Sequence, residues 1–514
     1  MTVLQPLRMS ARSESAGVSF MSLQSPSTSN LEAGIDGPGD EIVVDSTTVY
    51  ALPVDPAQFD RATEIRPLSL MRPHMRVFHV SWFSAIFGFL GWYAIPPLMP
   101  VIKEQMGLTT VEILNSDIAS TSSTIISRVV LGPLLELYGP QTVQTLTLWF
   151  GAIPIFAAAF VSNVTGLIIV RFFIGLVGCI FVSSQFWTSI TFAKNVVGTS
   201  NAITGGLGLS GIGFAFLILP NVNVWLASSS AISDDLAWRI TIALPAAVML
   251  IMGAVSQYRA DSCPMGEFHR FRLAQLEASS GISGASNSHM SIGFKEVISR
   301  LLKSFKVVLT DVNAYVLILH YGVSFGAELQ LNNMGALYFY EEFLKSPDCN
   351  QDDPECHVLS TTHAALLAST FGLMNMFARA LGGLASDHMN RRLGMRGRLV
   401  VQFFTLCMLG VFVIVLSRLR SLGPCIVLYI LVAIAAQSAG GSSFSIVPYV
   451  NEAFTGTVTG LVGAGGNLGG VIYGIIFRMT SSRADGLLWM GGIILVSALF
   501  TVCIKIQDKE QRLR

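Results

Sequence analysis

Long apolar segments separated by short polar breaks dominate this chain from residue 78 onward. About 20 consecutive apolar residues can cross a bilayer as a helix, and inside a bilayer the backbone polar groups must be satisfied within the protein. The pattern predicts an all-α integral membrane protein with twelve spanning helices. We place them at residues 78–101, 113–136, 142–161, 165–192, 201–224, 237–257, 313–340, 360–386, 398–418, 422–445, 455–478 and 485–506.

Composition excludes several other classes of protein. Only 12% of the 514 residues are charged, whereas a soluble domain has about 25%. The 32 basic residues balance 32 acidic ones, so no basic field is present to bind nucleic acid. The sequence contains no zinc-protease motif, nucleophile elbow or P-loop, and its cysteines lack metal-site spacing. We therefore predict no enzyme activity, no metal and no cofactor.

The spans and polar segments predict five regions. Residues 1–75, rich in Ser, Thr, Pro and Gly, are expected to be a disordered tail. Residues 76–257 and 313–506 are expected to form two six-helix bundles, joined by a polar linker at 258–312 and followed by a short tail at 507–514. Lys and Arg concentrate in the loops that fall on one side of this arrangement, which predicts that both termini and the linker are cytoplasmic.

The two halves contain matching residues at nearly constant separations. Arg128 and Arg379 lie 251 positions apart, as do Gly132 and Gly383 near the ends of the second and eighth spans. The glycine-rich runs that begin at Gly205 and Gly463 are 258 positions apart. Such an internal repeat predicts two pseudo-symmetric bundles related by an axis along the membrane normal.

Arg128 and Arg379 are the candidate ligand-binding residues. An arginine inside a span is expensive to insert, at about 2.5 kcal/mol or more, so each needs a partner. One reading is that each pairs with a buried carboxylate or marks the end of a helix. The other is that the two guanidinium groups face each other across the repeat interface and bind a small planar anion with paired hydrogen bonds. Arg171, near the outer end of its span, is interpreted as structural.

The seventh span adds an intramembrane carboxylate and aromatic surface. Tyr321, Phe325 and Glu328 recur at helical spacing and therefore share a face. Glu328 can be a proton carrier or the counter-ion of an arginine, and the sequence favours neither. Phe181 in the fourth span adds another ring, and Asn467, inside a glycine run, can donate to an anion or lock a helix pair.

Glycine clusters and two cysteines complete the candidate set. Glycine is unfavourable inside a helix unless a neighbouring group must approach closely, so the runs predict tight packing between helices. Cys349 and Cys356 bracket an acidic segment and can form a disulfide if it faces an oxidising exterior. The glycines singled out are Gly205, Gly206, Gly208, Gly211, Gly463, Gly465, Gly466, Gly469 and Gly470.

Several motifs together resemble the nitrate/nitrite porter family of the major facilitator superfamily. They are FHVSWFS in the first span, FVSSQFW in the fourth, FGAEL in the seventh, FGLMNMFARALGGLASD in the eighth and GLVGAGGNLGG in the eleventh. The resemblance implies that Arg128 and Arg379 bind nitrate, that Phe181, Tyr321 and Phe325 line the site, and that the glycine helices move during alternating access. It also implies proton-coupled uptake of nitrate, and of nitrite, at the plasma membrane. Some plant members need a small accessory membrane protein.

Two departures from the family pattern affect the expectation. Leu209 follows Gly208 where the family usually has Asn, which removes one amide from the site. Glu136 stands for the usual Asp after the second span with no arginine behind it, which predicts a weaker cytoplasmic gate in the first half. A nitrate/nitrite exchanger and a nitrate sensor that signals through its tail remain the alternative functions.

Overall fold

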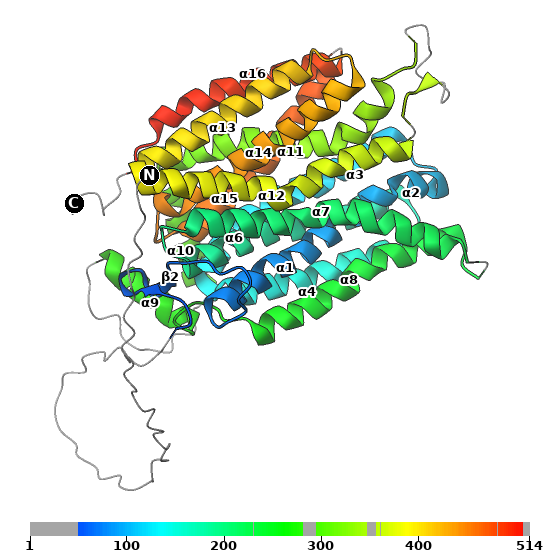
Figure 1. Ribbon diagram of the computed structural model, residues 1–514. Coiled ribbons are helices and arrows are strands. Elements are labelled where there is room, and N and C mark those ends of the chain that lie inside the picture. Colours follow the sequence, from blue (N-terminus) through cyan, green and yellow to red (C-terminus); the bar gives the residue numbers. More distant parts are fainter. Residues whose placement is uncertain are drawn as a thin grey trace, which may run out of the picture. The chain divides into compact units, whose positions relative to one another are not determined.

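The computed structural model describes residues 50–229, 231–280, 294–346, 356–359, 361–480 and 482–506, and most of them are helical (Figure 1). In the first half, the long helices run back and forth between the two ends of the molecule. They are α1 (His74–Trp92), α3 (Thr110–Tyr138), α4 (Pro140–Ala158), α5 (Val164–Gly175), α6 (Ile180–Thr191), α7 (Val197–Ala227) and α8 (Asp234–Arg259). Short helices extend two of these spans: η2 (Pro96–Leu98) and α2 (Met99–Met106) follow α1, and η3 (Leu176–Cys179) joins α5 to α6.

The second half repeats this plan with six helices. They are α11 (Val312–Glu341), α12 (Thr361–Leu393), α13 (Met395–Leu416), α14 (Leu422–Val450), α15 (Thr455–Met479) and α16 (Arg483–Leu499), which continues into η5 (Phe500–Cys503). In the sequence, the segment that connects the two halves contains α9 (Phe268–Ser280) and α10 (Phe294–Val308). We call the end of the bundle at which α9 and α10 lie the linker end (Figure 1).

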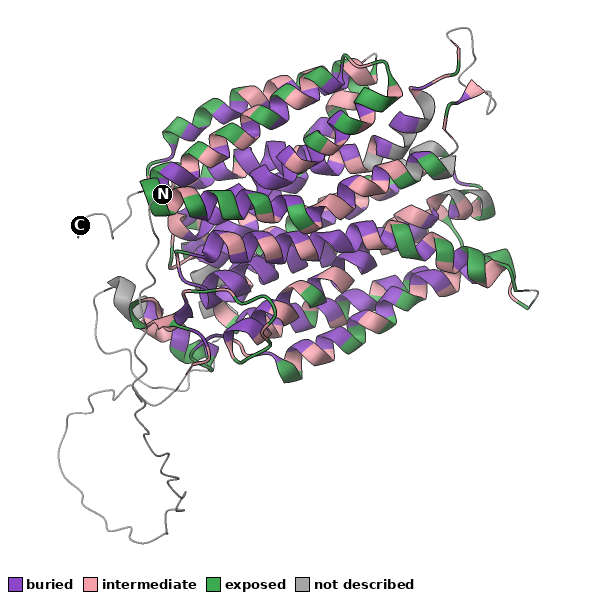
Figure 2. Cartoon of the chain, viewed as in Figure 1, coloured by how far each residue is buried: buried purple, intermediate pink, exposed green. Residues whose placement is uncertain are grey.

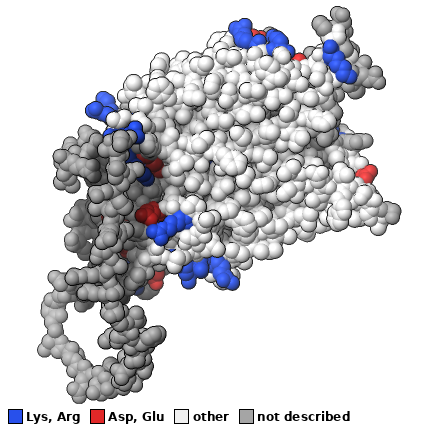
Figure 3. Space-filling model, viewed as in Figure 1, with Lys and Arg blue, Asp and Glu red and all other residues white. Residues whose placement is uncertain are grey.

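Each of the twelve predicted spans coincides with one of these long helices or helix pairs. Within the described residues, nine helices are long and apolar enough to cross a membrane, and a tenth span results if the bent pair 302–308 and 312–332 is counted as one. The other two predicted spans correspond to α4 and α12. The broad uncharged middle of the face in Figure 3, with its charged residues at the margins, has the surface expected of a multi-pass membrane protein.

The burial of the helices also fits a protein surrounded by lipid. The helices at the centre of the molecule are buried on most sides, whereas the outer helices expose one face (Figure 2). That outer face carries large apolar side chains, including Phe150, Phe160 and Trp489, each more than 60% exposed. Such exposure is expected where the surrounding medium is lipid rather than water.

The two halves meet where small residues let backbones approach. α3 packs against α15, and a Cβ on Gly132 would lie 2.5 Å from the carbonyl oxygen of Gly456. In the matching place α7 packs against α12, where a Cβ on Gly206 would overlap the carbonyl oxygen of Asn375. Each half therefore contributes its second and fifth helices to the interface, as the repeat predicts.

Residues 50–73 differ from the predicted tail. They contain β1 (Val54–Asp55), η1 (Pro56–Gln58) and β2 (Arg61–Ala62), with the two strands antiparallel. The Ala62 carbonyl accepts from the Ala193 N–H at 2.8 Å, and the Gln58 side chain accepts from the Lys194 N–H at 3.0 Å. The expectation of disorder is therefore wrong for this segment, because contacts with the loop between α6 and α7 stabilise it. Residues 1–49 and 507–514 lie outside the described part.

Candidate functional site

Arg128 lies at the contact between the two halves. Its side chain extends from α3, is fully buried, and donates from Nε to the Gly178 carbonyl at 3.0 Å and from Nη1 to the Gly463 carbonyl at 2.9 Å. The Asn467 amide, turned so that its oxygen faces Arg128, also accepts from Nε and Nη1, at 3.2 and 2.9 Å. The Nη2 atom is buried and has no hydrogen-bond partner. One guanidinium edge is thus left with unused donors.

Arg379 is held differently, although it occupies the matching place in α12. Its Nη2 donates to Glu328 Oε2 at 3.0 Å and its Nε donates to Asn375 Oδ1 at 3.3 Å. The Asn375 amide in turn donates to Glu328 Oε1 at 2.6 Å. Arg379 and Glu328 are both about 1% exposed, and Nη1 of Arg379 has no hydrogen-bond partner. The structure therefore places Glu328 as the counter-ion of Arg379.

Three predicted aromatic rings lie between the two arginines. Tyr321 and Phe325 stack with centroids 5.1 Å apart, and Phe181 from α6 stacks on them at 6.1 and 6.5 Å. The Cζ of Arg128 lies 5.3 Å from the centroids of Phe181 and Phe325, and that of Arg379 lies 5.8 and 6.0 Å from the same two. Both cations therefore contact one aromatic stack.

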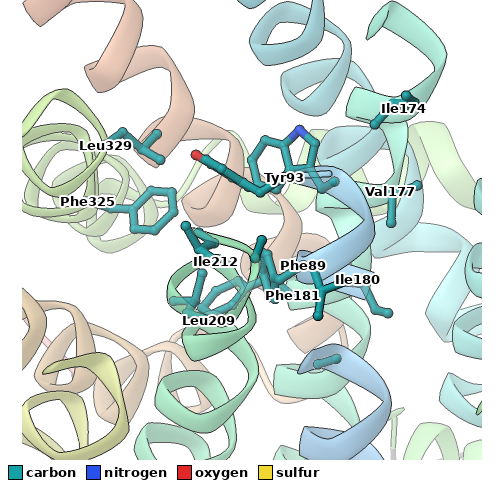
Figure 4. Close-up of a cluster of buried hydrophobic side chains, with 14 of the residues drawn as sticks. Phe89, Tyr93, Ile174, Val177, Ile180, Phe181, Leu209, Ile212, Phe325 and Leu329 are labelled. Carbon is teal, nitrogen blue, oxygen red and sulfur yellow. The ribbon is translucent and has the colours of Figure 1, made fainter. Parts of the chain in front are cut away.

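The stack belongs to a larger buried hydrophobic cluster. Figure 4 shows Phe325 and Phe181 with Leu209, Ile212 and Phe89 in this cluster. Leu209, the residue that departs from the family pattern, is fully buried and contributes apolar surface at this place. The site therefore gains hydrophobic packing in the position where an amide was expected.

The electrostatics of the two arginines are unequal. Within the described residues, Arg379 is neutralised by Glu328, whereas Arg128 donates to neutral carbonyl and amide groups. A buried charge without a partner of opposite sign is strongly unfavourable in a low-dielectric interior. A small anion at Arg128 would supply the missing charge and accept from the unused Nη2.

Glycines leave the space that these side chains occupy. A Cβ on Gly205 would lie 2.9 Å from Gln185 Nε2 and 3.4 Å from Arg379 Cδ, and one on Gly466 would lie 2.7 Å from both the Tyr321 and Phe325 rings. Of the other predicted glycines, Gly208 and Gly211 pack against α1, and Gly465, Gly469 and Gly470 pack against α11. Close packing is thus observed throughout, while their conformational role stays a prediction.

We expect Gly440→Ala to weaken anion binding by displacing Arg379. A Cβ on Gly440 would lie 2.8 Å from Nη1 and 3.1 Å from Cζ of Arg379, closer than atoms in contact tolerate. Overpacking of this kind is worth about 1–3 kcal/mol, so the half-saturating anion concentration should rise by about tenfold. Gly423→Ala on the same helix, where the added methyl meets open space, is the control. Equal half-saturating anion concentrations in the two variants would contradict the assignment of Arg379 to anion binding.

Some site residues were missed by the sequence predictions. Asn375 precedes Arg379 by one helical turn, a spacing that indicates a shared face. Phe444 meets Phe181 and Tyr321 edge-on at 4.9 and 4.8 Å, and it carries no signal in the sequence because α14 contributes it from outside every motif considered. Arg171 pairs with Asp117 at 2.6 Å, away from the stack. Cys349 lies outside the described residues, so its disulfide with Cys356 stays a prediction.

Comparisons with known proteins agree with this architecture. The family model described as Major Facilitator Superfamily matches residues 81–474. High affinity nitrate transporter 2.5 of Arabidopsis thaliana is 32% identical over 91% of this chain and 87% of its own length. Nitrate transporter 2.2 of Chlamydomonas reinhardtii is 31% identical over 82% and 77%, and the nitrate/nitrite transporter NrtP of Picosynechococcus is 25% identical over 80% and 86%.

Solved structures reproduce the fold at much lower identity. The proton:xylose symporter XylE is 15% identical, with a TM-score of 0.57 over 86% of this chain and 99% of that chain. At this identity the likeness concerns the fold alone. The predicted all-α architecture is confirmed.

Proposed function

The chain belongs to the major facilitator superfamily, within its nitrate/nitrite porter family, and we propose that it takes up nitrate, and also nitrite, together with protons by alternating access. Its relatives named nitrate transporters match most of the chain. The observation that carries the proposal is the buried Arg128 guanidinium, which has a free donor and no carboxylate partner among the described residues.

The chemistry of the site suits a small planar oxyanion. A guanidinium group is planar and permanently charged, and it matches an oxyanion edge with paired donors. Phe181 and Phe325 offer flat surfaces beside both arginines, and apolar walls favour a weakly hydrated anion over one that holds its water firmly. The unused donors of Arg128, Arg379 and Tyr321 supply hydrogen bonds for such an anion.

Glu328 offers a physical route to proton coupling. An anion that recruits Arg379 must compete with Glu328, which holds that arginine at 3.0 Å. If Arg379 turns to the anion, the buried Glu328 carboxylate loses its counter-charge. Uptake of a proton then neutralises that carboxylate. Anion binding and proton binding therefore favour each other, which is the thermodynamic requirement for symport.

We place the linker end in the cytosol and the protein in the plasma membrane. The basic loops gather on the side of the linker, as the positive-inside tendency requires of a cytosolic side. An inside-negative potential opposes anion entry by about 2.3 kcal/mol per charge per 100 mV. Net inward current with nitrate therefore needs more than one proton per anion.

The test is a voltage-clamp measurement on cells that express the full chain. Nitrate added outside should evoke an inward current that grows as the outside pH falls, and chloride at the same concentration should evoke far less. Exchange of labelled nitrate for nitrite without current would favour the exchanger instead. A chain that reaches the surface but moves neither anion, even beside a small accessory membrane protein, would contradict the transport proposal and favour the sensor.

A further inference from the structure

At the linker end, two carboxylates each hold the first turn of a helix from the opposite half. Glu136, near the end of α3, accepts from the backbone N–H of Thr457 at 2.9 Å and from its hydroxyl at 3.0 Å, at the start of α15. Asp387 of α12 accepts from the backbone N–H of Thr199 at 2.5 Å, at the start of α7. Helix N-termini favour negative charge. Both contacts must break for the halves to separate at this end.

An arginine completes each of these contacts in the same way. Arg398 pairs with Asp387 at 2.6 Å and donates to the Lys194 carbonyl at 3.0 Å, in the loop before α7. Arg272 approaches Glu136 at 3.4 Å and donates to the Ala453 carbonyl at 2.6 Å, in the loop before α15. Lys194 and Ala453 are 259 positions apart, close to the separation of the two glycine runs. At pseudo-symmetric places, the two arginines therefore tie each of these gate carboxylates, Glu136 and Asp387, to the loop that precedes the helix it holds.

The arginines differ in their origin along the chain. Arg398 comes from α13, the helix that directly follows α12. The residue that precedes Arg398 by the repeat separation of 251 is Thr147, and no basic residue occurs between Glu136 and Thr147. Arg272 instead comes from α9 in the central linker, and Gln275 fixes that helix by donating to the Glu452 carbonyl at 2.7 Å. The arginine that is absent after the second span is thus replaced by Arg272, which comes from a distant segment of the chain.

We propose that Arg272 is a positioning residue of the gate, which brings from the central linker the cation that the first half lacks. Its side chain is only 14% exposed and lies against a carboxylate that is 5% exposed, so solvent weakens the pair little. Arg272 contacts both halves at once, through Glu136 and through the loop before α15. Separation of the halves at this end therefore requires Arg272 to release one of them, and any partner or modification that shifts α9 acts on the gate. This inference rests on the proposed alternating-access function.

The experiment measures how often the linker end opens. Thr459 is fully buried on α15, two residues after Thr457 and four before the Gly463 contact of Arg128. In the full chain carrying Thr459→Cys, a membrane-impermeant thiol reagent is added to the linker side of inside-out vesicles, and modification at position 459 is followed by peptide mass spectrometry. Losing a hydrogen-bonded charge from the closed gate should raise that rate by about tenfold in Arg272→Ala.

Matched variants separate a gate role from a general loss of structure. Arg270→Ala on the same helix removes an arginine that is 77% exposed and that, within the described part of the chain, pairs with Glu267 of the preceding turn, so its rate should equal that of the parent. Arg272→Lys keeps the charge without the guanidinium fork, and we expect a rate between those of the parent and Arg272→Ala. Parent-like modification in both Arg272 variants overturns the proposal, and Arg272→Lys decides alone if Arg272→Ala is not recovered folded.

The readout is independent of the transported anion. Modification at position 459 reports opening of the gate in the absence of nitrate, so a failure of the nitrate assignment leaves this test valid. Conversely, a normal nitrate current combined with parent-like modification in Arg272→Lys and Arg272→Ala would overturn the gate proposal alone. The two inferences are therefore tested separately.

Discussion

Arg128→Lys is expected to reduce nitrate uptake by at least about thirtyfold in chains that reach the surface normally. The guanidinium of Arg128 holds two carbonyls of different halves and still has Nη2 free for an anion. A lysine ammonium is compact and cannot serve these directions together. Hydrogen bonds that involve a charged group are worth about 1.5–3 kcal/mol each, so the loss of more than one of them corresponds to thirtyfold or more. Initial rates of labelled nitrate uptake measure the effect.

The matched control is Arg171→Lys in the same half. Arg171 is also buried, but it pairs with Asp117 at 2.6 Å and with the Ser116 hydroxyl at 3.0 Å, neither of which contacts the aromatic stack. Lysine retains that ion pair, so uptake should fall by less than about threefold. Comparable losses in the two variants would mean that buried arginines support folding in general and that Arg128 has no special relation to the anion.

The span positions and the paired arginines could be predicted because both signals are local or periodic. A membrane helix can be recognised from a run of apolar residues. Arg128 and Arg379 are also supported by their equivalent positions in the internal repeat. Helical spacing also identified the shared face of Tyr321 and Phe325, whose rings the structure stacks 5.1 Å apart. Each of these features can be predicted from a single helix together with the separation between the two repeats.

Contacts between helices were harder to predict, since they depend on how each helix is rotated about its axis. The sequence left Glu328 as either counter-ion or proton carrier, and only the packing of α11 against α12 places its carboxylate on Arg379. Phe444 reaches the stack from α14 for the same reason. Arg272 contacts Glu136 across 136 positions of chain, and no motif connects the two.

The ordered segment at residues 50–73 shows a different limit. The sequence of this segment is polar and has no apolar periodicity, which predicts disorder when the segment is considered alone. Backbone hydrogen bonds such as that between Ala62 and Ala193 stabilise it through a loop more than 100 residues away. Folding of such a segment depends on the surface it meets, so composition alone misjudges it.

The paired state of Glu328 and Arg379 determines what a neutral residue at position 328 should do. Gln has nearly the same shape as a protonated Glu, so Asn375 and Arg379 can still approach it while the full ion pair is lost. Arg379 is then free to reach the anion at every pH. Nitrate binding should persist in Glu328→Gln, whereas its dependence on a proton at position 328 should disappear.

Glu328→Gln is therefore expected to remove one coupled proton from nitrate uptake and so to weaken the dependence of uptake on the pH gradient. Each coupled proton multiplies the attainable accumulation of nitrate by about ten per unit of pH difference, so loss of one proton site removes that factor. Accumulation of labelled nitrate in vesicles with an imposed pH gradient, at zero membrane potential, measures it. Glu342→Gln, at the residue directly after α11, changes a carboxylate that pairs with Arg420 at 3.0 Å outside the site, and this variant should accumulate nitrate as the parent does. If Glu328→Gln keeps the full gradient dependence of the parent, the coupling proton binds elsewhere, and Glu328 serves only to hold Arg379 in place.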